Sequence, residues 1–250
     1  MIVFVVFLYF LSTLPFLVLF KLAPNFTRKI LNFYISFYSR LILIILRVKI
    51  TIEGNFVDKR KNYFIVSNHL SYLDIFIISS RFPTSFVTSI EMKKTPLLGQ
   101  IATLGGCLFV ERRSRNNIKK EISEIDAALK DGLNVVVFPE AKSTNGEKVW
   151  DFKRSLFQSA INAETSILPL TLNYDRVNDL EVNLSNRDSL FWYDDMEFLP
   201  HIINLCKLKN IEMTIQVSEL IENIHEECDS KILRDHAHNL VSTKYRPILK

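Results

Sequence analysis

The sequence predicts an α/β protein with a mixed, mostly parallel sheet flanked by helices, preceded by an N-terminal membrane-attached helical segment. After residue 53, short apolar runs alternate with longer amphipathic ones, which favours strand–helix repeats over a sandwich of strands. The first 20 residues carry no charge at all. We therefore expect membrane-anchoring helices in residues 1–52 and one α/β domain in residues 53–250.

Residues 1–20 are an uncharged, strongly apolar stretch. As a continuous helix they would span about 30 Å, the thickness of the hydrocarbon core of a bilayer, although Pro15 is expected to introduce a kink. A cleaved signal peptide is disfavoured, because no basic residue precedes the stretch and no small-x-small cleavage site follows it. We expect this stretch to anchor the chain in a membrane.

A second apolar segment covers residues 33–46 and contains Arg40, which argues against an ordinary second span. An interfacial or shallow re-entrant helix, with Tyr34, Phe37 and Tyr38 at headgroup depth, fits better, and a core helix of the globular domain is the alternative. Basic residues surround this segment: Lys21, Arg28, Lys29, Arg47 and Lys49. Because they follow the first apolar stretch, they predict a site on the cytoplasmic face of the membrane.

Composition excludes several functional classes. The chain is 48% hydrophobic and 23% charged, and its net charge of +4 suits anionic lipid surfaces. It has no basic stripe interleaved with aromatic residues, so we expect no nucleic-acid partner. The 3 cysteines are widely spaced and predict neither a disulfide framework nor a zinc site. His236 and His238 have metal-binding spacing, but a solvated helix face is the simpler interpretation, and no metal is expected.

Apolar runs predict the strands at residues 63–66, 85–88, 107–110, 135–138 and 167–172. Ile118, Ile122, Ile125 and Leu129 recur at helical spacing, and Gly132 is a suitable residue to end that helix. Residues 53–55 are expected to form a linker, and the polar residues 175–188 a surface excursion.

His69 and Asp74 are separated by four residues and lie between two apolar runs. A neutral imidazole can accept a proton from a hydroxyl, and a carboxylate on its other nitrogen fixes the tautomer and stabilises the imidazolium. On one helix the two residues would point about 140° apart, so the pairing requires a strand-to-helix turn. Alternatively, Ser71 caps a helix and Asp74 serves only that helix start. The two interpretations are compatible.

Polar clusters follow three of the predicted strands. They are His69, residues 111–113 and residues 139–140. Because chemistry in open α/β sheets collects beyond the carboxyl ends of the strands, we expect these clusters to lie near one another.

Four short motifs, in order, resemble those of the glycerolipid acyltransferase family typified by 1-acylglycerol-3-phosphate acyltransferases, and the resemblance covers residues 55–174. The motifs are Asn68-His69-x4-Asp74, Gly106-Cys107-Leu108-Phe109-Val110-Glu111-Arg112, Phe138-Pro139-Glu140, and Ile167-Leu168-Pro169-Leu170. Pro96-Leu97-Leu98-Gly99 and Phe152-Lys153-Arg154-Ser155 are also similar. One such motif would carry little weight, but the ordered set is specific.

The resemblance implies that His69, oriented by Asp74, removes the proton from a glycerol hydroxyl as it attacks an acyl thioester. Arg112 would bind the phosphate of the acceptor, Glu140 would fix the acceptor or the polar network, and Pro169 would shape the wall of the acyl chain. The remaining substrate-binding candidates from these motifs are Asn68, Gly106, Phe109 and Lys142. No cofactor is required, because a thioester is already activated.

The third motif departs from the commoner Phe-Pro-Glu-Gly-Thr-Arg form, since residues 141–144 read Ala-Lys-Ser-Thr. Loss of the arginine weakens the case for a phosphatidic-acid-forming enzyme, and the ending resembles branches that acylate other lysophospholipids or lyso-aminolipids. Lys142 could supply a cation, although it lacks a bidentate fork. The segment from Trp192 to His201 resembles bacterial members of the group without implying a role, and His201 is expected to be structural.

We therefore expect a membrane-bound acyltransferase that transfers an acyl group from acyl-CoA or acyl carrier protein to a lysophospholipid. The favoured acceptor is 1-acyl-sn-glycerol 3-phosphate, giving phosphatidic acid, and a lyso-aminolipid such as lyso-ornithine lipid is the alternative. A non-enzymatic lipid-binding protein of the same fold is a rival from another class. An esterase is disfavoured, because the sequence has no Gly-x-Ser-x-Gly motif.

Overall fold

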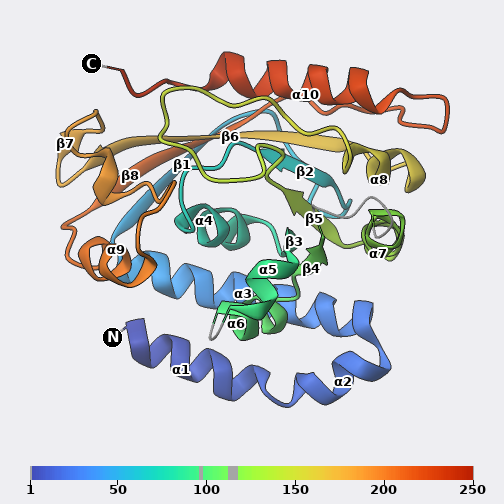
Figure 1. Cartoon of the computed structure of the whole chain (residues 1–250), viewed down its shortest axis with the longest axis horizontal. Coiled ribbons are helices and arrows are strands. Elements are labelled where there is room, and N and C mark those ends of the chain that lie inside the picture. The colour runs from blue at the N-terminus through green and yellow to red at the C-terminus, as the bar shows by residue number, and fades with distance from the viewer. Residues whose placement is uncertain (1, 96–97, 112–117, 250) are drawn as a thin grey trace.

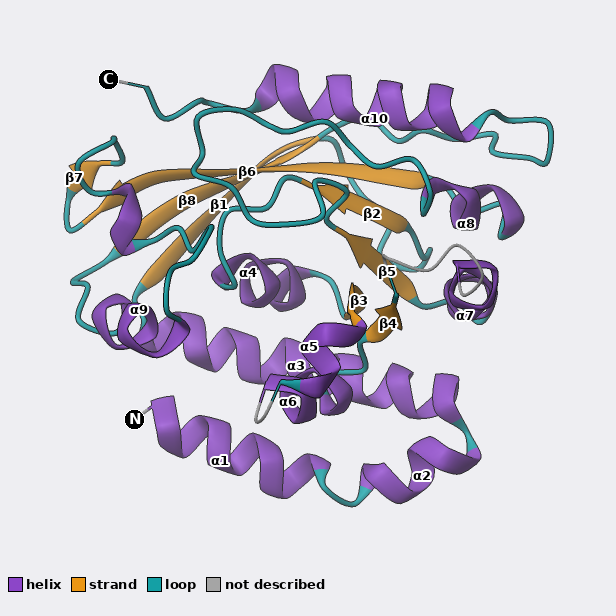
Figure 2. Cartoon of the chain, viewed as in Figure 1, coloured by secondary structure: helices purple, strands orange, loops and turns teal. Residues whose placement is uncertain are grey.

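The computed structural model describes residues 2–95, 98–111 and 118–249. Figure 1 shows a twisted sheet with helices on both faces, and two further helices outside one of these layers. Figure 2 separates the strands from the helices in the same view. The predicted fold class, a mixed and mostly parallel sheet flanked by helices, is confirmed.

The sheet in the described part of the chain has eight strands, in the order β1-β8-β6-β2-β5-β3-β4, with β7 paired to β6. Strands β6, β2, β5, β3 and β4 run parallel to one another. Strand β8 is antiparallel to β6 and parallel to β1. Their bounds are β1 Val48–Gly54, β2 Phe64–Ser67, β3 Thr84–Ser89, β4 Leu108–Val110, β5 Asn134–Val137, β6 Ile167–Val177, β7 Leu180–Glu181 and β8 Ile211–Val217.

Two apolar cores lie on opposite faces of the sheet. On one face pack α7 (Ile118–Lys130), α8 (Phe157–Asn162) and α10 (Ser230–Lys244). The other face is covered by α3 (Pro24–Ile45), α4 (Leu73–Arg81) and α9 (Phe198–Leu205). Short helices α5 (Ile90–Lys94) and α6 (Leu98–Leu104) connect β3 to β4, and the 3₁₀ turn η1 covers Arg187–Ser189.

The N-terminal stretch is not one straight helix. It forms α1 (Ile2–Thr13) and α2 (Phe16–Leu22), which meet at Leu14 and Pro15. Proline removes a helical hydrogen bond and crowds the preceding turn, which accounts for a break at this place. Among the helices described, none alone has the length and apolar character needed to cross a bilayer, whereas Phe4–Thr13 and Phe16–Leu22 together do, with a 44° bend between them.

Helix α3 has two different faces. Leu31, Ile35, Ile42 and Leu43 are buried, and the helix packs against α4 and β3. Exposed apolar side chains occupy the opposite face: Phe26, Phe33, Phe37 and Ile44. One face of α3 therefore packs in the globular domain. This agrees with the alternative expectation, a core helix, for that face.

The segment expected to be a linker is instead the end of β1. Glu53 and Gly54 pair with Gln216 and Val217 of β8, and Asn55 donates its backbone N–H to Val217. Gly54 has a φ of +103°, and a Cβ there would lie 2.1 Å from the Val217 carbonyl oxygen. The boundary expected between residues 52 and 53 thus falls inside β1. The apolar residues of this strand follow the apolar N-terminal segment closely in sequence, so the sequence does not separate the two.

Candidate active site

Two of the three predicted polar clusters meet at the carboxyl ends of neighbouring parallel strands. His69 follows β2 and Glu140 follows β5, and these strands pair in parallel register. The His69 backbone N–H donates a 2.8 Å hydrogen bond to Glu140 Oε1. Of the third cluster, Arg112 and Arg113 lie outside the described residues.

His69 is held as a general base would need to be. Its Nδ1 lies 2.9 Å from Asp74 Oδ2, and its ring stacks on Phe138 with centroids 4.0 Å apart and planes at 10°. A carboxylate only accepts hydrogen bonds, so Nδ1 carries the proton and Nε2 bears the free lone pair. The side chain remains 18% exposed, and Nε2 has no protein partner among the residues described. The predicted pairing of His69 with Asp74 is present.

The Asp74 carboxylate is fully buried and hydrogen-bonded on both oxygens. Oδ2 accepts the backbone N–H groups of Leu70 at 2.7 Å and Ser71 at 2.9 Å, besides the imidazole. Oδ1 accepts the hydroxyl of Tyr174 at 2.7 Å. These donors offset the cost of removing a charge from water. Sequence reasoning missed Tyr174, although the hydroxyl of a buried tyrosine usually needs a hydrogen-bond partner.

Asp74 also lies in the first turn of α4, as predicted, but Ser71 is not the N-cap residue. Tyr72 occupies that position, and the Ser71 hydroxyl only accepts a 3.4 Å contact from the N–H of Leu73. The carboxylate of Asp74 accepts the Ser71 N–H, which is one half of the capping box expected from Ser71-x-x-Asp74. The helix start and the histidine therefore share one carboxylate, so the two interpretations of this motif are both present.

Glu140 fixes the main chain around the histidine. Its side chain is 3% exposed, and its second oxygen, Oε2, accepts the N–H of Trp150 at 2.7 Å. Burial raises the pKa of this carboxyl to about 8, against the two backbone N–H groups that favour its anion. On the other side of the residue, the His69 carbonyl accepts the Thr144 N–H at 2.9 Å. Residues 140–144 thus clamp the His69 main chain from both ends.

Asn68 and Pro169 lie beside this clamp without an exposed side chain. The Asn68 amide accepts the Leu172 N–H at 2.8 Å and donates to the Leu172 carbonyl at 3.0 Å, which ties the loop after β2 to β6. Pro169 is a buried residue of β6, paired with Val66 of β2.

Gly106 and Phe109 lie on a different part of the sheet. Gly106 precedes β4, at the opposite end of the strand from Glu111, and has a φ of +71°. A Cβ there would lie 3.0 Å from the side chain of Asn32 on α3, so close packing requires the glycine. Phe109 is partly buried within β4, and the Lys93 ammonium lies 5.0 Å from its ring centre.

The unusual third motif has a distinct local geometry. Ala141 adopts a φ of +73°, a left-handed conformation that favours glycine, and the commoner motif has glycine there. Lys142 is exposed, pairs with Asp194 at 3.1 Å and lies 4.7 Å from the ring centre of Trp150. The buried Ser143, where the commoner motif has arginine, donates to the Trp192 carbonyl.

His201 is structural, as expected. The buried ring bridges Tyr72 and Phe191, with Nδ1 2.9 Å from the tyrosine oxygen and Nε2 2.9 Å from the Phe191 carbonyl. Since the carbonyl can only accept, Nε2 donates and Nδ1 accepts from Tyr72. Burial lowers the pKa of His201, so the ring is held neutral. In the parts of the chain that are described, no group of three or more histidine, cysteine or acidic side chains could hold a metal ion.

Comparison with known proteins assigns the family. Residues 48–173 match the family model described as Acyltransferase. The lyso-ornithine lipid O-acyltransferase of Brucella abortus is 29% identical over 239 residues, 92% of this chain and 87% of that protein. The 1-acyl-sn-glycerol-3-phosphate acyltransferase of Neisseria gonorrhoeae is 39% identical over 110 residues, 44% and 43% of the two chains.

A solved structure supports the same fold. The crystal structure of the 1-acyl-sn-glycerophosphate acyltransferase PlsC from Thermotoga maritima superposes with a TM-score of 0.62, covering 96% of this chain and 95% of that one at 18% identity. Its likeness concerns the fold alone. The family model matches residues from β1 to β6, including His69, Asp74 and Glu140, and shows that this chain belongs to the Acyltransferase family.

Proposed function

We propose that this protein is a lysophospholipid acyltransferase that uses His69 as its general base. The observation that carries the proposal is the geometry of one side chain. His69 Nδ1 donates to the buried Asp74 carboxylate, while Nε2 keeps a free lone pair at a partly exposed position. This arrangement matches a base that accepts a proton from an incoming hydroxyl.

The reaction follows from that geometry. Nε2 takes the proton of the acceptor hydroxyl while the hydroxyl oxygen attacks the carbonyl carbon of an acyl thioester. The tetrahedral intermediate collapses and the carbon–sulfur bond breaks. The leaving thiolate then takes up the proton that His69 had accepted. An ester and a free thiol are formed. Asp74 stabilises the imidazolium between these two steps, and Asn68 and Glu140 act as positioning residues for the loop that carries the base.

The substrates are lipids and an activated acyl group. We propose acyl-CoA or acyl carrier protein as the donor. Relatives named for 1-acyl-sn-glycerol 3-phosphate and for lyso-ornithine lipid support a lysolipid acceptor. The first of these, which would yield phosphatidic acid with Arg112 on its phosphate, is the acceptor that the shared motifs favour. The altered residues 141–143 support the second.

A membrane surface is the expected place of action, because both acceptors are amphiphiles. Exposed apolar side chains are concentrated on α1, α2 and the outer face of α3, and include Phe4, Phe7, Leu11, Leu14, Val18, Leu22, Phe26 and Phe33. Such a patch is unusual on a monomeric soluble protein and fits insertion among lipid tails. We propose that these helices hold the protein on the cytoplasmic face.

Replacement of the base tests the proposal. His69→Ala should reduce acyl transfer from a thioester to a lysolipid by about 10²- to 10⁴-fold, the usual contribution of a general base. The measurement is product formation by mass spectrometry with purified enzyme and a panel of lysolipid acceptors. His236→Ala is the matched control, because this histidine is exposed on α10, on the other face of the sheet.

Near-normal turnover in His69→Ala would contradict the mechanism. Absence of transfer by the unaltered protein to every acceptor tested would instead favour the rival, a lipid-binding protein that retains the fold without its chemistry. Release of free fatty acid without dependence on acceptor would indicate an esterase.

A further inference from the structure

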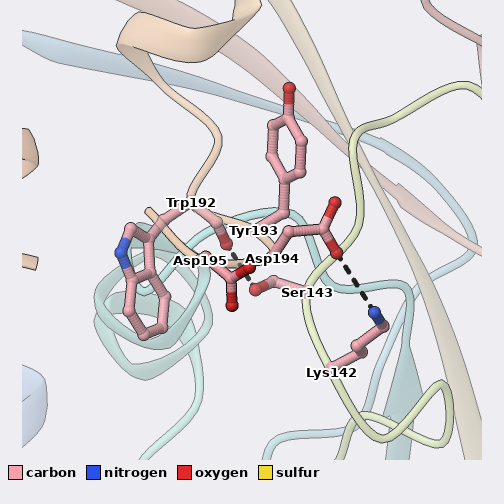
Figure 3. A pocket seen from close by; sticks show the side chains of 6 residues that line it. All are labelled: Lys142, Ser143, Trp192, Tyr193, Asp194 and Asp195. Atoms are coloured by element: carbon pink, nitrogen blue, oxygen red, sulfur yellow. Dashed lines mark hydrogen bonds and ion pairs between the residues drawn. The ribbon is translucent and has the colours of Figure 1, made fainter. Parts of the chain in front are cut away.

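A pocket of about 530 Å³ opens beside the catalytic loop. It is lined by the two residues that depart most from the common third motif and by a segment before α9: Lys142, Ser143, Trp192, Tyr193, Asp194 and Asp195. Figure 3 shows Lys142 reaching Asp194, and Ser143 joined to the Trp192 backbone. Neither the catalytic histidine nor Asp74 lines this pocket, so the chemistry proposed above leaves its role unassigned.

The walls of the pocket are attached directly to the loop that carries the base. Thr144, next to Ser143, donates its N–H to the His69 carbonyl at 2.9 Å, and the Trp192 N–H donates to the Leu70 carbonyl at 3.0 Å. The ring of Tyr72 meets the Trp192 ring edge-on, with centroids 6.1 Å apart. A headgroup in this pocket would therefore lie beside the residues that position His69.

The charges on the pocket wall have a definite balance. Lys142 is its one cationic residue, and the exposed Asp194 and Asp195 are its two anionic residues. Asp194 already pairs with Lys142. Asp195 has no ion-pair or hydrogen-bond partner within the described ranges, so one carboxylate is left for a ligand.

We infer that this pocket binds the headgroup of the acceptor, and that the headgroup carries both an ammonium and an anionic group. Asp195 would pair with the ammonium, with Trp192 and Tyr193 as aromatic neighbours that also attract cations. Lys142 would pair with the anionic group. The inference rests on the proposed acyltransferase function and adds the class of its acceptor.

A phosphate monoester suits the pocket less well. It carries about −1.5 to −2 charge at neutral pH, and it would enter a pocket whose described charges sum to −1 (one lysine against two aspartates). Ser143 adds no charge, and its hydroxyl is already engaged with Trp192. An ornithine headgroup, with its side-chain ammonium and its carboxylate, matches the two signs of charge. The pocket therefore favours a zwitterionic acceptor over 1-acyl-sn-glycerol 3-phosphate.

Removal of the free carboxylate tests this inference. The acceptors are lyso-ornithine lipid and 1-acyl-sn-glycerol 3-phosphate, presented in the same micelles with the same acyl donor. Asp195→Asn should lower kcat/KM for lyso-ornithine lipid about tenfold or more, mainly through KM, as expected for loss of a charge-assisted hydrogen bond. With 1-acyl-sn-glycerol 3-phosphate, kcat/KM should stay the same or rise. Asp194→Asn is a second variant, since asparagine tolerates the left-handed φ of +49° found there.

The matched control is Asp235→Asn. This aspartate is exposed on α10, on the opposite face of the sheet, and pairs with Arg234. It should leave both acceptors unaffected. Equal loss with both acceptors in Asp195→Asn, or no loss with either, would overturn the headgroup assignment. If the unaltered enzyme acylates neither acceptor, the proposed function fails instead, and the two failures are thereby distinguished.

Discussion

Asp74 performs two tasks with one carboxylate. It starts α4 by accepting backbone N–H groups, and it fixes the tautomer of His69 through Nδ1. Tyr174 from β6 completes the set of donors. Because the imidazole is one of the donors to this buried carboxylate, its rotation away would cost Asp74 a hydrogen bond that water cannot replace. The direction of Nε2 is thus determined by the fold.

A substitution can remove the charge of Asp74 and keep most of its hydrogen bonds. In Asp74→Asn, the amide oxygen can still accept from Leu70 and Ser71, and the amide nitrogen can face the Tyr174 hydroxyl. The imidazolium, however, loses its counter-charge. We expect kcat to fall about 10²- to 10⁴-fold with little change in thermal unfolding temperature.

Tyr174→Phe is the matched control for Asp74→Asn. It removes one donor to the same carboxylate and keeps the charge, so kcat should fall far less, while stability drops by about 1.5–3 kcal/mol. A loss of kcat as large as that of Asp74→Asn would show that the organisation of the carboxylate, rather than its charge, limits turnover.

At the scale of single elements, α3 joins a packed face to an exposed apolar face. Leu43 and Ile44 are neighbours in sequence but are 4% and 70% exposed. Leu43→Ala should lower the free energy of unfolding by about 2–5 kcal/mol, because it leaves a cavity in the core beneath α4. Ile44→Ala removes atoms that face outward and should change stability by less than about 0.5 kcal/mol. Chemical denaturation of the two variants in detergent is the measurement.

Equal stability losses in the two variants would contradict the two-faced character of α3. Loss in neither would show that α3 is a detachable anchor and contributes no packing to the α/β domain.

The elements also show what could be predicted from the sequence. All five predicted strands exist within a few residues of the expected positions, because parallel central strands are buried on both faces and appear as continuous apolar runs. β1, β8 and the two-residue β7 (Leu180–Glu181) are not predicted. The apolar residues of β1 and β8 alternate, as in Ile211, Met213, Ile215 and Val217 of β8, and such alternation is easily overlooked between amphipathic helices.

The site itself was predictable only in part. His69 and Glu140 were predicted because polar residues follow apolar strands, and Asp74 because of its spacing from His69. Tyr174 and Thr144 did not, since their contacts join segments that lie 100 and 75 residues from their partners in sequence. Short-range patterns carry no information about such contacts, which depend on sheet order and register. The contact between residues 192–195 and residues 142–143 in the pocket wall also joins segments that are distant in sequence.

At the scale of the whole molecule, most of the large exposed apolar side chains lie on the N-terminal helices α1 to α3 on one side of the sheet, whereas α10 covers the other face (Figure 1). This asymmetry predicts one preferred orientation at a bilayer. Phe7→Ser combined with Leu11→Ser, two exposed residues one turn apart on α1, should weaken vesicle binding by about 10²- to 10⁴-fold, given about 1.5–3 kcal/mol for each buried side chain.

Co-sedimentation with anionic phospholipid vesicles measures this effect. Ile232→Ser is the matched control, because Ile232 is 67% exposed but lies on α10. Unchanged sedimentation of the double variant, or an equal loss in the control, would mean that the exposed face of α1 is not the one that meets lipid.

The clamp formed by residues 140–144 has a consequence for how such enzymes diversify. Glu140 binds the backbone N–H of His69 and Thr144 binds its carbonyl, while Lys142 and Ser143 between them line the pocket. The length of this five-residue loop is therefore constrained by turnover, whereas its central side chains are open to change. A library intended to alter substrate preference should keep residues 140 and 144, permit no insertion or deletion between them, and randomise only 142 and 143.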